Sequence, residues 1–121
     1  MLTGASGFIG GQFKNYYQSQ GWKVYTLGRQ AGDDLQWDML SNLGSFAAKL
    51  SFPIDRIIHC AAINETRANE CLSATYKINV TLTRLLCDLA IELAVKDFIY
   101  LSTFHVYGTT SSLVGPLCEC K

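Results

Sequence analysis

The stretch that decides the fold is Thr3–Gly10, TGASGFIG, in which glycines stand at positions 4, 7 and 10. Gly4 permits a tight turn out of a strand, and Gly7 lets the backbone approach a pyrophosphate where a Cβ would collide. Gly10 lets the following helix pack closely on the sheet. That helix presents free N–H groups and a partial positive charge to an anion. The spacing therefore predicts a phosphate cradle for a dinucleotide.

Only Met1 and Leu2 precede this motif. We therefore expect a short first strand and a chain that is clipped at this end. Downstream of the motif, Ile9, Phe13 and Tyr17 recur at helical spacing, which predicts a helix over 8–20 that ends at Gly21.

Further strands are expected over 22–27, 35–37, 56–60 and 98–102, with helices over about 40–50 and from 69 or 71 to 93 or 94. Residues 109–121 have no periodicity and should be irregular. Alternating strands and helices imply right-handed crossovers and a parallel sheet covered on both faces. The fold class predicted for the single domain, 1–121, is α/β, a Rossmann-type doubly wound sheet of about five strands in the order 3-2-1-4-5, incomplete at the C-terminus.

The amino-acid composition argues against several classes of function. The chain of 121 residues suits one domain, with 49% hydrophobic residues, 17% charged residues and a formal net charge of zero. This balance argues against a nucleic-acid partner, and no apolar run is long enough to span a membrane. The five cysteines are an odd number without a regular framework, which favours free thiols in the cytoplasm. Cys118-Glu119-Cys120 lacks the further ligands of a metal site, so no metal is expected.

The long helix carries two apolar stripes. One contains Tyr76, Val80, Thr83, Cys87, Ala90 and Ala94, and the other contains Ile78, Leu82, Leu85, Leu86, Leu89 and Leu93. One stripe should cover the sheet, and the other needs a further helix or a second subunit. Because few other helices remain in the chain, a homodimer through residues 71–94 is favoured over an internal helix.

Polar and small residues follow the later strands. His59-Cys60-Ala61-Ala62 ends one strand, Ser102-Thr103 ends the last one, and Asn79 lies in the long helix. Ligands of open α/β sheets bind at the carboxyl ends of the strands, so these segments predict one shared site.

Together these motifs resemble the extended short-chain dehydrogenases/reductases, and within them the NAD(P)-dependent epimerase/dehydratase group that acts mostly on nucleotide-sugars. The resemblance rests on TGASGFIG, WDML (37–40), HCAA (59–62), Asn79-Val80 and STFHVYG (102–108), and it covers nearly the whole chain. It implies NAD or NADP as cofactor and a nucleotide-sugar substrate in the intact enzyme. The cofactor-binding residues that it implies are Gly4, Ser6, Gly7, Phe8, Ile9, Gly10, Asp38, Met39, Cys60, Ala61, Ala62 and Asn79.

Within this resemblance, Phe8 and Ile9 touch the pyrophosphate, Asp38 and Met39 meet the adenine, and Ala61 and Ala62 line the nicotinamide side. Thr103 stands where the family has its catalytic Ser or Thr. A hydroxyl fixed at a strand end can donate to a substrate oxygen and stabilise charge that develops during hydride transfer.

Several of these residues have a second interpretation. Ser102 could take the role of Thr103, or both hydroxyls could simply cap the loop. Asn79 could be a buried amide that satisfies backbone groups, and Asp38 could cap the next helix.

Cofactor preference depends on the end of the second strand. Arg29 follows Gly28 there, and its planar donors suit a 2′-phosphate, so NADP is slightly favoured. Asp33 and Asp34 lie later in the loop and could oppose that preference. A solvent-facing Arg29 is the other interpretation.

The family's Tyr-x-x-x-Lys pair cannot be assigned before Lys121. Loss of a general acid/base costs about 10²- to 10⁴-fold in rate, so we expect this chain to hold a cofactor half-site without turnover. The alternative is a non-catalytic NAD(P)-binding sensor or interaction module. We also expect an exposed apolar patch and a free sheet edge.

Overall fold

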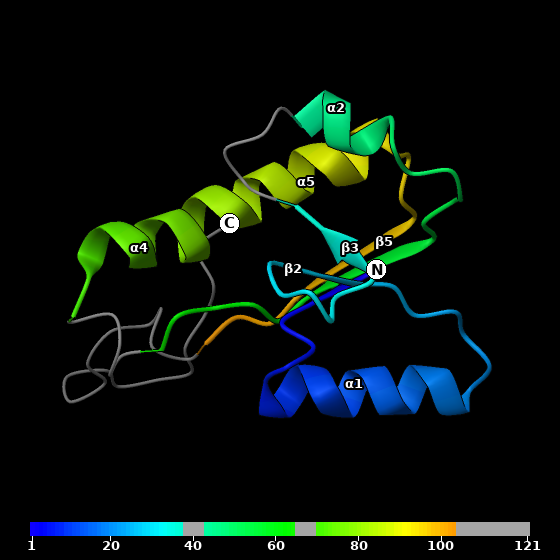
Figure 1. The fold of residues 1–121 in the computed structure, drawn as a ribbon, viewed down its shortest axis with the longest axis horizontal. Coiled ribbons are helices and arrows are strands. Elements are labelled where there is room, and N and C mark those ends of the chain that lie inside the picture. Colours follow the sequence, from blue (N-terminus) through cyan, green and yellow to red (C-terminus); the bar gives the residue numbers. More distant parts are fainter. Residues whose placement is uncertain (38–42, 65–69, 104–121) are drawn as a thin grey trace, which may run out of the picture.

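The computed structural model describes residues 1–37, 43–64 and 70–103 (Figure 1). Within these residues five parallel strands form one sheet in the order β3-β2-β1-β4-β5. The strands are β1 (Leu2–Thr3), β2 (Thr26–Gly28), β3 (Leu35–Gln36), β4 (Arg56–His59) and β5 (Asp97–Tyr100). The predicted α/β class and strand order are thereby confirmed.

Helices cover both faces of the sheet, as a doubly wound fold requires (Figure 1). Helix α1 (Phe8–Ser19) lies on one face. On the other face lie α2 (Leu43–Ala47), α4 (Leu72–Tyr76), the π-helix η1 (Lys77–Leu82) and α5 (Thr83–Glu92). The last three follow one another without a break and match the long helix predicted from the sequence.

The main core lies between the sheet and α5. Ile57 in β4, together with Leu86 and Leu89 in α5, is completely buried, and Phe46 from α2 packs in the same cluster. Successive residues of a strand point to opposite faces, so Ile58 points away from this cluster, toward α1. Packing on both faces of the sheet therefore fixes the positions of the carboxyl ends of these short strands.

The second strand is shorter than predicted. A strand over 22–27 was expected, whereas β2 begins at Thr26. Strand β1 pairs only Leu2 with Thr26 and Thr3 with Leu27, and its last hydrogen bond in this direction runs from the Leu2 N–H to the Tyr25 carbonyl at 2.9 Å, so it offers residues 22–24 no ladder partner. These residues instead line a pocket of about 360 Å³ beside α1, together with Phe13 and Tyr17.

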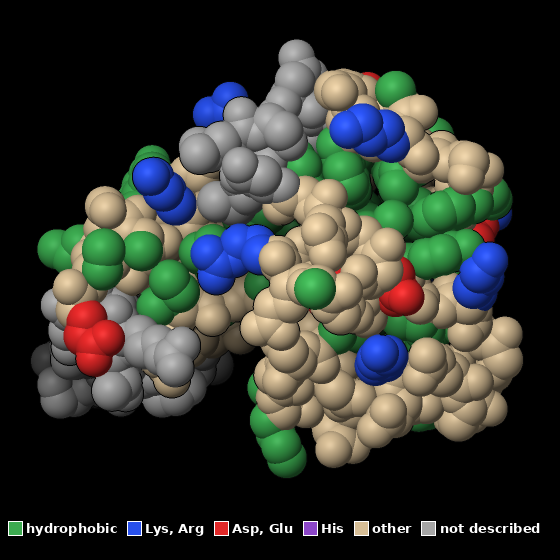
Figure 2. Space-filling view, in the orientation of Figure 1, with side chains coloured by type: hydrophobic (Ala, Val, Ile, Leu, Met, Phe, Trp, Pro, Cys, Tyr) green, Lys and Arg blue, Asp and Glu red, His purple; other side chains and the backbone are tan. Residues whose placement is uncertain are grey.

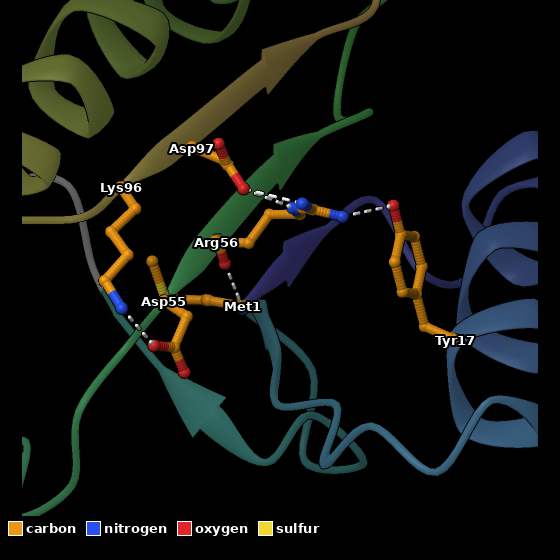
Figure 3. Close-up of polar contacts among 6 residues, drawn as sticks. All are labelled: Met1, Tyr17, Asp55, Arg56, Lys96 and Asp97. Atoms are coloured by element: carbon orange, nitrogen blue, oxygen red, sulfur yellow. Dashed lines mark hydrogen bonds and ion pairs between the residues drawn. The ribbon is translucent and has the colours of Figure 1, made fainter.

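Arg56 joins α1 to the edge of the sheet (Figure 3). Its guanidinium donates to the Asp97 carboxylate at 2.6 and 3.0 Å and to the Tyr17 hydroxyl at 3.1 Å. It also lies over the rings of Tyr17 and Trp22. The backbone carbonyl of the same residue accepts a hydrogen bond from the Met1 amine at 2.7 Å.

The two stripes of the long helix have different surroundings. Leu86 and Leu89 are buried, whereas Tyr76, Val80 and Cys87 are exposed. Leu72 and Ile91 extend the exposed stripe at its two ends, and Figure 2 shows hydrophobic side chains at the surface over α4. The expected apolar patch is therefore present. Strand β5 forms one edge of the described sheet, with Tyr100 45% exposed.

Candidate dinucleotide-binding site

The turn after β1 is built by close backbone contacts. Gly4 has a φ of +71°, and a Cβ there would stand 2.7 Å from the Ala61 nitrogen in the loop after β4. The Gly7 N–H donates to the Gly4 carbonyl at 3.0 Å. A Cβ on Gly10 would overlap that same carbonyl oxygen. The sequence TGASGFIG thus holds the start of α1 directly against the end of β1.

The first turn of α1 is open to an anion. Gly7 is the N-cap and makes no side-chain capping bond, and this fully described helix has no acidic residue in its first turn. Its first N–H groups therefore keep their partial positive charge. Among the described residues, a Cβ on Gly7 would meet only the Gly4 oxygen, at 3.3 Å. This part of the chain therefore leaves that space free, as a cradle for a phosphate requires.

A pocket of about 490 Å³ opens at the carboxyl ends of the strands. The ends of β1, β2, β3 and β4 and one face of η1 form its wall. The lining residues are Thr3 to Gly7, Leu27 to Gln30, Asp33, Trp37, Cys60 to Ile63, Ile78 and Leu82. Segments far apart in sequence therefore converge here, at the switch point of the parallel sheet, where the connections from neighbouring strands leave toward opposite faces.

The imidazole of His59 is buried beneath this pocket and connects its walls. Thr83 Oγ1 donates to the Asn79 carbonyl at 3.0 Å, so it must accept from His59 Nε2–H at 2.9 Å. His59 Nδ1 then accepts from Thr3 Oγ1–H at 2.7 Å, and Thr3 Oγ1 accepts the Ala61 N–H at 3.2 Å. Burial lowers the pKa of His59, which favours this neutral form.

Asn79 holds the loop after β4 from the helix side. Its Oδ1 accepts the Ile63 N–H at 2.8 Å, and its Nδ2 donates to the Ile63 carbonyl at 2.9 Å. Both bonds come from within π-helix η1, the kind of local irregularity often found at functional sites. The side chain therefore fixes the pocket wall, which is the buried-amide interpretation given above.

The loop between β2 and β3 is also ordered by carboxylates. Asp34 Oδ2 accepts from the Thr26 N–H at 2.8 Å and from the Thr26 hydroxyl at 2.9 Å. These bonds lower the pKa of Asp34. Asp33 Oδ2 accepts the Gln30 N–H at 2.9 Å and closes a turn over residues 30–33.

The structure brings about half of the predicted site residues together. Gly4, Ser6, Gly7, Arg29, Cys60, Ala61 and Ala62 line the pocket. Phe8 and Ile9 begin α1 with exposed side chains, Gly10 is buried beneath them, and Asn79 lies behind the wall. Ser102 and Thr103 are exposed just after β5, outside the pocket lining, and Asp38 and Met39 lie outside the described residues.

Sequence reasoning missed Thr3 and Trp37 as parts of the site. Thr3 is the first residue of TGASGFIG but gives no signal of its own, because its hydroxyl matters only through His59, 56 residues later. Trp37 lines the pocket, and among the described residues its buried Nε1–H has no hydrogen-bond partner. An unpaired buried donor at a ligand pocket fits a ligand that carries acceptor atoms.

Other chemistry finds less support in the described residues. Burial raises the pKa of the Cys60 thiol, which disfavours a nucleophilic thiolate. Within residues 1–37, 43–64 and 70–103 no group of three His, Cys, Asp or Glu side chains converges as metal ligands would. Cys118 and Cys120 lie outside those ranges. No helix in the described part of the chain is long and apolar enough to cross a membrane.

The uncapped start of α1, the glycine cradle and the pocket at the switch point define a dinucleotide-binding Rossmann-type domain. Residues 1–118 match the model of the NAD dependent epimerase/dehydratase family, and the chain belongs to that family. The resemblance stated from the motifs is thereby confirmed.

Individual relatives agree with this assignment. Sterol-4-alpha-carboxylate 3-dehydrogenase, decarboxylating, of Dictyostelium discoideum is 31% identical in an alignment 116 residues long that covers 84% of this chain and 34% of that protein. UDP-glucose 4-epimerase of Thermotoga maritima, solved with UDP-glucose, superimposes with a TM-score of 0.77 at 20% identity, over 96% of this chain and 41% of that one. MoeE5, solved with UDP-glucose and NAD, gives 0.73 at 22% identity, over 93% and 39%. The chain thus spans about a third to two fifths of these relatives.

Proposed function

We propose that this chain is the cofactor-binding portion of an NAD(P)-dependent enzyme that moves a hydride to or from a substrate carbon, in the manner of nucleotide-sugar epimerases, dehydratases and reductases. The observation that carries the proposal is the convergence of the Gly4–Gly7 turn, the end of β2 and Cys60–Ala62 on one pocket. The family's description as NAD dependent supports the same cofactor class.

The residues divide into holding and orienting roles. The N–H groups at the start of α1 would bind the pyrophosphate, and the small side chains of Ala61 and Ala62 would leave room for the nicotinamide. Bound NAD(P) would supply the hydride chemistry. His59 and Asn79 hold the loop after β4, so they act as positioning residues.

Thr103 is the proposed donor to the substrate oxygen, with Ser102 as the alternative. Both follow β5 directly, beside the loop after β4, because the Leu101 N–H donates to the His59 carbonyl at 3.1 Å. In the whole protein a hydroxyl here would stabilise the negative charge that grows on a carbonyl oxygen as its carbon receives a hydride, and the alkoxide that forms when a substrate hydroxyl loses its proton in the reverse direction.

A sterol is the second candidate substrate class for the whole protein, because the curated relative is a sterol dehydrogenase with a higher sequence identity than the epimerase structures. A non-catalytic NAD(P)-binding module remains the alternative if the whole protein turns over neither class.

We further propose a cytoplasmic homodimer. The exposed stripe of the long helix supports a second copy as partner, and Cys60, Cys71 and Cys87 are free thiols in the described structure, as a reducing compartment would keep them.

Cofactor binding is the direct test. Calorimetric titrations of the 121-residue chain with NADH and with NADPH should each show saturable binding at one site. Gly7→Ala should weaken binding at least about tenfold, because its Cβ enters the space left for the pyrophosphate. Gly11→Ala is the matched control, since its Cβ makes only an ordinary contact of 3.6 Å and should leave affinity unchanged. Absence of binding to well-folded wild-type chain would refute the proposal.

A further inference from the structure

The carboxylate of Asp33 lies where a side chain of residue 28 would be. A Cβ built on Gly28 would overlap Asp33 Oδ2 and would stand 2.6 Å from its Cγ and 2.9 Å from its Oδ1. Gly28 is the last residue of β2. An acidic residue at the end of this strand is what recognises the ribose 2′-hydroxyl in NAD-binding Rossmann folds. In this chain glycine occupies that position, and the carboxylate of Asp33, five residues later in the sequence, lies beside it.

This carboxylate is held in place by its own loop. Asp33 Oδ2 accepts the Gln30 N–H at 2.9 Å, and the Asp33 N–H donates to the Gln30 carbonyl at 3.0 Å. The Gln36 side chain donates to the same carbonyl at 3.1 Å. Asp34, next along the chain, is tied to Thr26 by three hydrogen bonds. The loop therefore cannot readily lift Asp33 from Gly28.

The same carboxylate faces the cofactor pocket. Asp33 and Gly28 both line it, and among the described residues Asp33 Oδ1 has no hydrogen-bond or ion-pair partner. Arg29 also lines the pocket, but its side chain is exposed and it makes no ion pair within the described part of the chain. At the end of β2, the fixed carboxylate of Asp33 favours a hydroxyl group as ligand, whereas the guanidinium of Arg29, which has no ion pair within the described part of the chain, favours a phosphate.

We propose that Asp33, seated on Gly28, is the residue that sets cofactor specificity and makes the pocket select NAD(H) over NADP(H). Its free oxygen accepts a hydrogen bond from a ribose 2′-hydroxyl, and its charge repels a 2′-phosphate at the same position. This reverses the preference that Arg29 alone predicts. The inference rests on the proposed function, since it assigns a role within that same pocket.

The test is paired titration of the 121-residue chain with NADH and NADPH, read as dissociation constants. Wild type should bind NADH at least about tenfold more tightly than NADPH. Asp33→Asn keeps an oxygen for the Gln30 N–H but removes the charge, and should shift that ratio at least about tenfold toward NADPH. Arg29→Met should weaken NADPH alone. Asp88→Asn, the same change of charge on α5 far from the pocket lining, should leave the ratio unaltered.

A ligand variant keeps the test independent of the folding of Asp33→Asn. The analogue of NADH that lacks the 2′-hydroxyl of the adenosine ribose has no group for Asp33 to bind. The wild-type chain should therefore bind this analogue about tenfold more weakly than NADH. Equal affinity for NADH and NADPH, an NADPH preference, or full affinity for the deoxy analogue would overturn the role of Asp33 while leaving the proposed function intact. Failure to bind either dinucleotide would overturn both.

Discussion

His59 shows how a single buried side chain can organise a site without entering it. Its ring bonds Thr3 and Thr83, its carbonyl accepts the Leu101 N–H, and its ring stacks on Tyr100 with centroids 5.4 Å apart. Since Nδ1 must accept and Nε2 must donate, only one neutral tautomer satisfies both hydroxyls. Protonation would place a second N–H against the Thr3 proton and charge a buried ring.

Stability should therefore fall as pH decreases below about 6.5. The folded-state pKa of His59 lies below the ordinary 6.5, so the unfolded chain binds the proton more readily. The stabilisation is complete above 6.5 and is lost at up to about 1.4 kcal/mol per pH unit below it. Urea unfolding between pH 5 and 7.5 measures this slope.

His59→Gln is the control for this slope. The variant should be less stable throughout but should lose the part of the slope that comes from the imidazole. The Met1 amine, whose pKa burial lowers to about 6, adds its own slope, but it does so equally in both proteins. The lowered pKa of Asp34 acts only below about pH 4. Parallel stability curves for wild type and variant would contradict the assignment.

Two adjacent glycines of α1 should respond oppositely to the same substitution. Gly10→Ala forces a methyl group into the Gly4 carbonyl and should cost about 1–3 kcal/mol of unfolding free energy. Gly11→Ala meets the Ala5 oxygen at an ordinary 3.6 Å and should gain about 0.5–1 kcal/mol from helix propensity. Chemical denaturation of both variants measures the difference, and a stabilising Gly10→Ala would show that the turn can yield.

At the scale of elements, the long helix is apolar on two sides but packed on one. Leu86→Ala removes a completely buried side chain and should cost about 2–5 kcal/mol of unfolding free energy. Ile91→Ala, five residues along the same helix, removes a side chain that is 79% exposed and should cost less than about 0.5 kcal/mol. Denaturation at low protein concentration compares them. Equal losses would mean that the outer stripe is covered within one chain.

The sequence predicted these elements unevenly, for physical reasons. TGASGFIG and the period of α1 are local signals, so the turn and helix were found within a residue or two. The extent of β2 depends on how much of β1 lies opposite, which no local pattern of residues 22–27 contains. Likewise, periodicity indicated two apolar stripes in the long helix, but tertiary packing decides burial: within the outer stripe, Thr83 is bonded to the buried His59 and Ala90 packs against the core.

The site divides in the same way. The glycines and the residues at strand ends could be predicted from the sequence, because each contributes to the pocket at its own position in the local motif. Asp33 acts on the space above Gly28, and Thr3 acts through His59, so both roles depend on a fold that brings distant atoms together. Asp33 was visible as a charge near Arg29, but its position over the strand end was not.

At the scale of the whole molecule, the exposed apolar side chains of the long helix lie together on one side of the helix. The exposed stripe of the long helix, formed by Leu72, Tyr76, Val80, Cys87 and Ile91, lies on the side of the helix that faces away from the sheet. We propose that these exposed apolar side chains form an interaction site, because folded proteins tend to cover apolar surface that gathers on one face. A twofold pairing of the helix with its own copy would cover the same stripe on both chains at once.

The chain should therefore self-associate, and one charge in the stripe should weaken that association. Tyr76 is 63% exposed, so Tyr76→Lys places an ammonium in the interface at little cost to the monomer and should raise the dimer dissociation constant at least about tenfold. Tyr16→Lys replaces a tyrosine that is 59% exposed on α1, across the sheet, and should leave association unchanged. Sedimentation velocity over a range of concentrations measures both variants. A wild-type chain that stays monomeric at high concentration, or equal effects of the two lysines, would exclude the long helix as the dimer interface.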